Sequence, residues 1–195
     1  MDDREYQLEQ RRYRQEWFKV FFSALTPIAL AVLAFVIHDT LREREAALKT
    51  REQIVAQKQA IYSRLGDRLN VIYVYVADVG DFRQYTPLQV VQRKRECDRI
   101  FFSYKFYWSQ DTEKAYEEFM QAAFKTYNGA GLAAKIRGLH TEKVAAYEFD
   151  KLKWNADWNA YFTGERDAQL QTKYYDLVYA LLGDIVNSEI RRVDS

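Results

Sequence analysis

The sequence predicts an all-α protein: a single N-terminal transmembrane helix that continues into a helical neck and a compact bundle of about four or five helices. Glycine and proline are scarce, at 7 and 2 of 195 residues, whereas residue types that favour long helices are abundant. Residues 20–37 contain no charged side chain, although charged residues make up 29% of the chain. We therefore expect a tail at 1–17, a membrane helix at 18–38, a neck at 39–59 and a bundle domain at 60–195.

The membrane helix is predicted from the length and the ends of the uncharged run. A helix of 18 uncharged residues is just long enough to cross most of a roughly 30 Å hydrocarbon core. Trp17 and Lys19 precede the run and His38 and Asp39 follow it, as expected at the two membrane interfaces. The residues expected inside the bilayer are Val20, Phe21, Phe22, Pro27, Leu30, Leu33, Phe35 and Ile37.

A cleaved signal peptide is the main alternative for this run. Arg11, Arg12 and Arg14 precede it, and residues 29–31 have the A-x-A form of a cleavage site. The leading segment is long and rich in acidic residues, however, and the apolar run continues to Ile37. An uncleaved anchor is the preferred interpretation, and a buried soluble helix is the third.

The neck and one side of the membrane helix indicate self-association. Apolar pairs occur once per heptad in the neck, but Arg44, Arg51 and Lys58 interrupt the stripe, so only a weak coiled coil is predicted. Small residues share one side of the membrane helix and would allow a close approach of helices, although ordinary alanine content explains them equally well. The predicted packing seam consists of Ser23, Ala24, Ala31, Ala34, Ala47, Leu48, Ile54 and Val55.

The bundle domain opens with a segment whose composition also suits a strand. Residues 70–79, NVIYVYVADV, are rich in β-branched and aromatic side chains. We predict a helix because helical patterns flank the segment and no partner strand is visible to satisfy an isolated strand's backbone. Gly80 is the expected end of this helix.

The remaining helices are predicted from their starts and stops. Thr86 and Gln89 form a capping box around Pro87, which predicts a helix from Pro87 to about Tyr107. Asp111 is expected to cap a helix that runs to Tyr127. The connector 128–140 holds three glycines and one short helical turn at most. Two further helices are expected: one from Thr141 to about Phe162, and a last one after Gly164 that includes Leu170 to Ile190.

The sequence offers no catalytic, cofactor-binding or metal-binding residues. The nucleophile-elbow, phosphate-loop and zinc-protease motifs are absent. Cys97 is the only cysteine and is expected to be a small core residue, and two histidines are too few for the usual zinc sites. The carboxylates at 78, 81, 117 and 118 are interpreted as solvated helix surface.

Two local patterns resemble functional sequences but depart from them. Arg137 and His140 resemble the Arg…His signature of the HEPN ribonucleases, yet fewer residues lie between them than that family requires, so no activity is implied. Residues 92–99, QRKRECDR, mix bases with following aromatics as single-strand binders do, but Glu96 and Asp98 interrupt them. With a net charge of +1, we expect no nucleic-acid partner.

The leading functional hypothesis is a non-enzymatic, single-pass membrane protein that binds, scaffolds or self-assembles at the bilayer. Its expected partners are lipid, copies of itself, and an unidentified protein or small molecule bound by the helical domain. The alternatives are an oligomeric pore-forming or membrane-disrupting effector and an enzyme without recognisable motifs. Basic residues balance on the two sides of the span, whereas the lone thiol and the absence of an Asn-x-Ser/Thr site favour a cytoplasmic domain.

Overall fold

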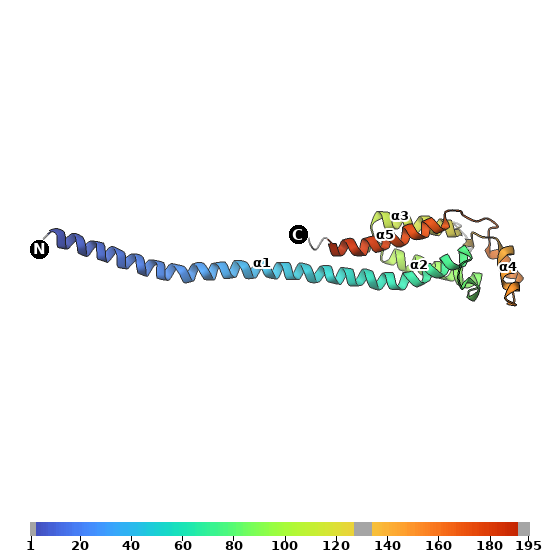
Figure 1. The fold of residues 1–195 in the computed structure, drawn as a ribbon, viewed down its shortest axis with the longest axis horizontal. Helices are drawn as coiled ribbons and strands as arrows, with labels where there is room; N and C mark the ends of the chain where they lie inside the picture. The colour runs from blue at the N-terminus through green and yellow to red at the C-terminus, as the bar shows by residue number, and fades with distance from the viewer. Residues whose placement is uncertain (1–2, 127–133, 191–195) are drawn as a thin grey trace. The chain divides into compact units, whose positions relative to one another are not determined.

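The computed structural model describes residues 3–126 and 134–190. The chain divides into two compact units, Met1–Thr50 and Arg51–Ser195. The described residues are predominantly helical, which confirms the all-α prediction. The helices are α1 (Asp3–Ala77), α2 (Pro87–Ser103), α3 (Gln110–Ala123), α4 (His140–Phe149) and α5 (Leu170–Ile190) (Figure 1).

The long helix α1 continues through the segment whose composition also suits a strand. It ends at Ala77, so the prediction of a helix is confirmed for residues 70–77, and residues 78 and 79 lie beyond its end. The turn that follows begins earlier than Gly80, because Asp78 already has a positive φ of 59°. Gly80 has a φ of 56°, a value at which glycine avoids the steric cost of a side chain.

Among the described residues, none of the helices combines the length and the apolar character needed to cross a lipid bilayer. The membrane helix proposed for residues 18–38 stays a prediction.

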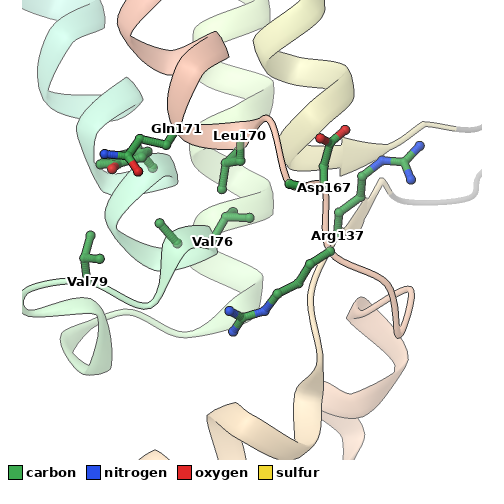
Figure 2. Close-up of a pocket in the computed structure, with 10 residues that line it drawn as sticks. Val76, Val79, Arg137, Asp167, Leu170 and Gln171 are labelled. Carbon is green, nitrogen blue, oxygen red and sulfur yellow. The ribbon is translucent and has the colours of Figure 1, made fainter.

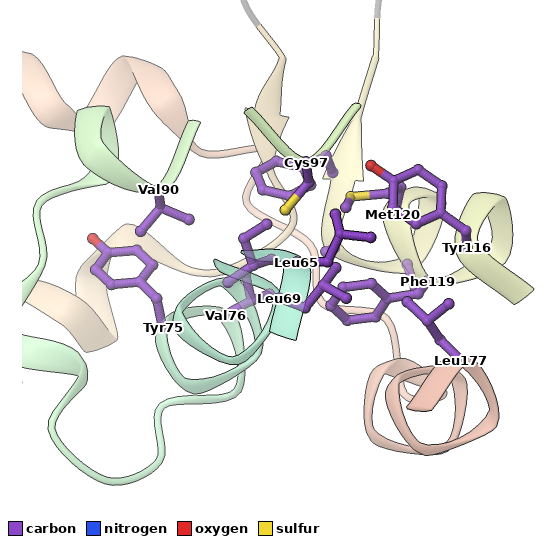
Figure 3. Close-up of a cluster of buried hydrophobic side chains, with 14 of the residues drawn as sticks. Leu65, Leu69, Tyr75, Val76, Val90, Cys97, Tyr116, Phe119, Met120 and Leu177 are labelled. Atoms are coloured by element: carbon purple, nitrogen blue, oxygen red, sulfur yellow. The ribbon is translucent and has the colours of Figure 1, made fainter. Parts of the chain in front are cut away.

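The core of the second unit includes buried side chains of α1, α2, α3 and α5 (Figure 3). On α1 its members recur every three or four residues, so they form one stripe along the helix. Buried members include Ile61, Leu65, Leu69, Ile72 and Val76 of α1, Val90 and Cys97 of α2, Phe119 and Met120 of α3, and Leu177 and Leu181 of α5. The rings of Phe101 and Tyr116 stack with 3.9 Å between their centroids, which fastens α2 to α3.

The start of α2 has the predicted capping box. The Gln89 amide nitrogen donates to Thr86 Oγ1 over 3.3 Å, and the Thr86 amide nitrogen donates to Gln89 Oε1 over 2.8 Å. The helix ends at Ser103 rather than near Tyr107, and a short 3-10 helix at Lys105–Tyr107 follows it.

The predicted cap of α3 was wrong. Ser109, not Asp111, caps the helix and accepts a hydrogen bond from the Thr112 amide over 3.2 Å. The Asp184 carboxylate of α5 holds this cap in place, because it accepts from the Ser109 amide over 2.8 Å and from the Thr112 hydroxyl over 2.7 Å. The helix stops at Ala123 and not at Tyr127, which lies outside the described residues.

Two short strands follow α3. β1 (Phe124–Lys125) pairs antiparallel with β2 (Lys135–Ile136), and Ile136 also forms a parallel bridge with Phe162. Residues 128–133 of the predicted connector lie outside the described part of the chain.

The single helix predicted from Thr141 to Phe162 was also wrong. α4 ends at Phe149, Lys151 has a positive φ of 57°, and a separate 3-10 helix spans Ala156–Tyr161. The break brings Trp154 edge-on to Tyr147 and to Trp158, each with 5.1 Å between ring centroids. Packing among the aromatic rings therefore accompanies the loss of helical continuity.

Candidate functional site

A buried lysine lies at the C-terminal end of α1. Lys143 comes from α4, and only 1% of its surface is exposed. Its ammonium group donates to the Tyr75 carbonyl oxygen and pairs with the Asp78 carboxylate. The centroids of the Tyr75 and Phe82 rings lie 4.1 and 4.4 Å from Nζ, which adds a cation–π contribution.

Asp78 connects this lysine to a second cation. Its carboxylate also pairs with the Arg166 guanidinium, which in turn pairs with Glu142. We call Asp78, Glu142, Lys143 and Arg166 the ion cluster. It joins the end of α1, the first turns of α4 and the segment that precedes α5.

Burial lowers the pKa of Lys143 to about 7, although the charge of Glu142 acts in the opposite direction. The contact with Asp78 also favours the ammonium form. That carboxylate is shared with Arg166, however, so it only partly offsets the loss of water around Lys143. Nζ is enclosed, and its contacts with Tyr75 and Asp78 join α4 to the end of α1.

A cavity of about 480 Å³ adjoins the ion cluster (Figure 2). Such a volume lies within the range of small-molecule sites. The end of α1 supplies an apolar wall with Val76 and Ala77. Leu170, at the start of α5, lies near Val76. The other lining residues are Tyr73, Val79, Arg137, Arg166, Asp167, Ala168 and Gln171.

The two arginines of the cavity differ in their partners. Arg166 already pairs with Asp78 and Glu142. Arg137 follows β2, and its Nε donates to the Gln121 carbonyl oxygen over 2.8 Å. Arg137 is half-buried and has no carboxylate partner within residues 3–126 and 134–190.

The described residues contain no group of three or more histidine, cysteine, aspartate or glutamate side chains that could hold a metal ion. Cys97 is buried, as predicted, and burial followed by the charge of Asp98 raises its pKa to about 12. A thiol in this state is a poor nucleophile.

The residues predicted to lie in the membrane belong to α1. The side chains of Val20, Phe21, Phe22 and Pro27 lie outside the described ones. Leu30, Leu33, Phe35 and Ile37 are exposed, and so are Leu25, Val36 and Leu41. The described part of this run thus presents large apolar side chains to its surroundings.

The predicted packing seam is divided between the two units. Ser23, Ala31, Ala34, Ala47 and Leu48 are exposed on the first unit, and the side chain of Ala24 lies outside the described ones. In the second unit Ile54 is exposed, whereas Val55 is half-buried against the core. A replacement of Ile54 therefore tests self-association without disturbing the core, whereas a replacement of Val55 would affect both.

An exposed apolar stripe on α5 was missed by the sequence analysis. It consists of Tyr175, Tyr179, Leu182 and Val186, which are exposed although Leu177, Leu181 and Ile185 of the same helix are buried. Their spacing of four, three and four residues places them on one side of the helix. The sequence shows this spacing, but α5 carries apolar residues on its core-facing side as well, and the sequence does not show which of the two sides is exposed.

The ion cluster was missed for a different reason. Asp78 was expected on a solvated helix surface, but it lies beyond α1 and pairs with Lys143 and Arg166. Its partners are 65 and 88 positions away in the sequence, and no local spacing points to them.

Comparison with known proteins finds no matching family model, no similar curated protein and no similar solved structure.

Proposed function

We propose that this chain is a single-pass membrane-anchored, non-enzymatic helical module that assembles with copies of itself at the bilayer. The observation that carries the proposal is the exposure of large apolar side chains around α1 between residues 25 and 41. The second unit, with the α5 stripe and the cavity, is the binding part.

The distribution of these side chains favours lipid over a protein groove. At about 100° per residue, Phe35 and Val36 lie about 140° and 240° around the helix from Leu30. The three residues thus lie on three sides of α1. The exposed fractions of their side chains are 60% for Leu30, 72% for Phe35 and 52% for Val36. A helix that docks on one partner needs a single apolar stripe, whereas a helix surrounded by lipid is apolar on all sides.

The α5 stripe supports self-assembly. Lys58 Nζ donates to the Asp184 carbonyl oxygen over 3.0 Å, so this part of α1 lies beside the C-terminal half of α5. Ile54 lies one turn before Lys58 on the same side of α1, and Val186 follows Asp184 by two residues. Ile54 is thus an exposed apolar residue near the C-terminal half of α5, and a second copy of the chain is the proposed occupant of the stripe.

Membrane extraction tests the anchor. The full chain should remain with membranes after carbonate and high-salt washes, because apolar transfer rather than charge holds it there. Leu30→Arg should release a substantial fraction, since an arginine near the centre of a span costs about 2.5–3.5 kcal/mol. Leu88→Arg is the matched control: Leu88 is also an exposed leucine, but it lies on α2. Equal extraction of the two variants would refute the anchor.

Light scattering tests self-assembly. The full chain in mild detergent should be a homo-oligomer, and Tyr179→Asp or Ile54→Asp should weaken it because the new charge would have to be desolvated. Phe149→Asp is the control, since Phe149 is highly exposed at the end of α4 and outside the stripe. A wild-type chain that is monomeric at every concentration would disprove the assembly.

A cytoplasmic location of the second unit is part of the proposal. It rests on the lone, buried thiol and on the absence of an Asn-x-Ser/Thr site. Reporter fusions at the C-terminus would test it, because a periplasmic or extracellular signal would reverse the orientation.

A further inference from the structure

We propose that the cavity between the ends of α1 and α5 binds a small organic carboxylate, and that Arg137 is the residue that binds its anionic group. The inference does not depend on the membrane anchor, because every residue of the cavity belongs to the second unit.

The first step is the state of Arg137. A half-buried guanidinium ordinarily has a counter-charge, because removal of an ion from water is costly. Arg137 forms no ion pair in the described part of the chain, and the one side-chain hydrogen bond that it makes there uses Nε. Its two terminal nitrogens keep the paired N–H groups that match a carboxylate.

The second step is the choice between the two arginines. Arg166 also lines the cavity, but Asp78 and Glu142 already neutralise its charge. An anion bound to Arg166 would have to displace one of these carboxylates. Arg137 requires no such exchange, so it is the favoured cation.

The third step is the kind of anion. Asp167 lies on the same cavity wall, where its Oδ1 accepts a hydrogen bond from the Gln169 amide over 2.8 Å. Its negative charge opposes any anion, and it opposes a doubly charged phosphate more strongly than a singly charged carboxylate. A carboxylate is therefore the better match.

The fourth step is the rest of the ligand. Val76, Ala77, Val79 and Leu170 provide an apolar lining, and Gln171 provides a polar group. The volume of about 480 Å³ exceeds what a bare carboxylate such as acetate would fill. The expected ligand therefore has an apolar or aromatic part next to its carboxylate.

Calorimetric titration of the full chain in mild detergent tests the proposal. The probe is 3-phenylpropionate, and its comparison ligands are 3-phenylpropanol, which has the same shape without the charge, and acetate, which lacks the apolar part. Wild-type protein should bind the probe at least about tenfold more tightly than either comparison ligand, as expected for loss of one charge-assisted pair or of the apolar contacts. Equal affinity for all three, or no binding of the probe at millimolar concentration, would overturn the proposal.

Variants identify the binding residue. Arg137→Gln should weaken binding of the probe about tenfold or more, whereas Arg93→Gln should leave it unchanged. Arg93 is a suitable control because it also loses one positive charge, but it pairs with Glu96 on α2. If the two variants bind 3-phenylpropionate with equal affinity, Arg137 is not the residue that binds the carboxylate. Circular dichroism confirms that each variant is folded, and the ligand comparison in wild-type protein stands even if Arg137→Gln does not fold.

Two further measurements test the role of Asp167 and the charge of the ligand. Asp167→Asn should strengthen binding of 3-phenylpropionate, because it removes the opposing charge. An unchanged or weaker affinity for the probe would contradict the place given to Asp167. Phenylalanine serves as the zwitterionic probe, and tighter binding of phenylalanine than of 3-phenylpropionate by wild-type protein would replace the proposed ligand class with an amino acid.

Discussion

The buried Lys143 should make the stability of the protein rise with pH above neutrality. Burial lowers its pKa in the folded state to about 7, from an ordinary value of 10.5. Between these two values the unfolded chain binds a proton that the folded chain does not, so the free energy of unfolding increases as pH rises. The slope is about 1.4 kcal/mol per pH unit, and the interval from pH 7 to 10 corresponds to roughly 4 kcal/mol.

Urea unfolding of wild-type protein and Lys143→Met measures this contribution. Other groups titrate in the same pH range, but they contribute equally to both proteins and cancel in the difference between them. That difference should be constant below pH 7 and should move in favour of the wild type by several kcal/mol toward pH 10. Lys114→Met is the control, because Lys114 is an exposed lysine on α3 and its replacement should give no such slope. A difference that does not vary with pH would show that Asp78 keeps Lys143 charged and that burial does not dominate.

Three other measurements test the fold. Asp78→Asn should lower the free energy of unfolding by about 2 kcal/mol or more at pH 6, because Lys143 loses its nearest counter-charge while asparagine tolerates the positive φ. In the Lys143→Met background the same replacement should lower the free energy of unfolding by less. An equal decrease in both backgrounds would mean that Asp78 and Lys143 do not interact. Thr86→Ala should cost about 1 kcal/mol in urea unfolding, and an unchanged midpoint would argue against the capping box with Gln89. Cys97 should react with iodoacetamide only as the protein unfolds, so rapid labelling of native protein would contradict its burial and raised pKa.

The predictions that succeeded depend on short-range interactions. The capping box at Thr86 and Gln89 is formed within one turn, so its residues identify it without reference to the rest of the chain. A helix was predicted correctly at residues 70–77 because backbone satisfaction outweighs side-chain propensity when no partner strand is available.

The cap of α3 shows where local reasoning becomes insufficient. Ser109 and Asp111 are both suitable capping residues, and their positions differ by two. The structure selects Ser109, whose amide and whose partner Thr112 are both bound by the Asp184 carboxylate. That carboxylate is 75 residues from Ser109, so no window around the cap contains the information.

The same limit applies to the candidate site. The cavity joins residues at the end of α1, after β2 and after the turn at Gly164, and no motif connects these segments in the sequence. In the sequence, Arg137 stands out only through its spacing from His140, which does not match the HEPN signature. Its significance comes from its place on the cavity wall and from its lack of a carboxylate partner among the described residues.

The arrangement of the core has a consequence for the order of folding during synthesis. The apolar stripe of α1 at residues 61–76 leaves the ribosome well before Leu177 and Leu181, which complete the same core. During that interval α2 and α3 can cover part of the stripe, but the side that α5 covers stays exposed, and exposed apolar surface of this kind is prone to aggregate. Contacts between such distant segments also form slowly. A chain arrested before α5 should therefore engage chaperones through α1, and release of α5 should end that association.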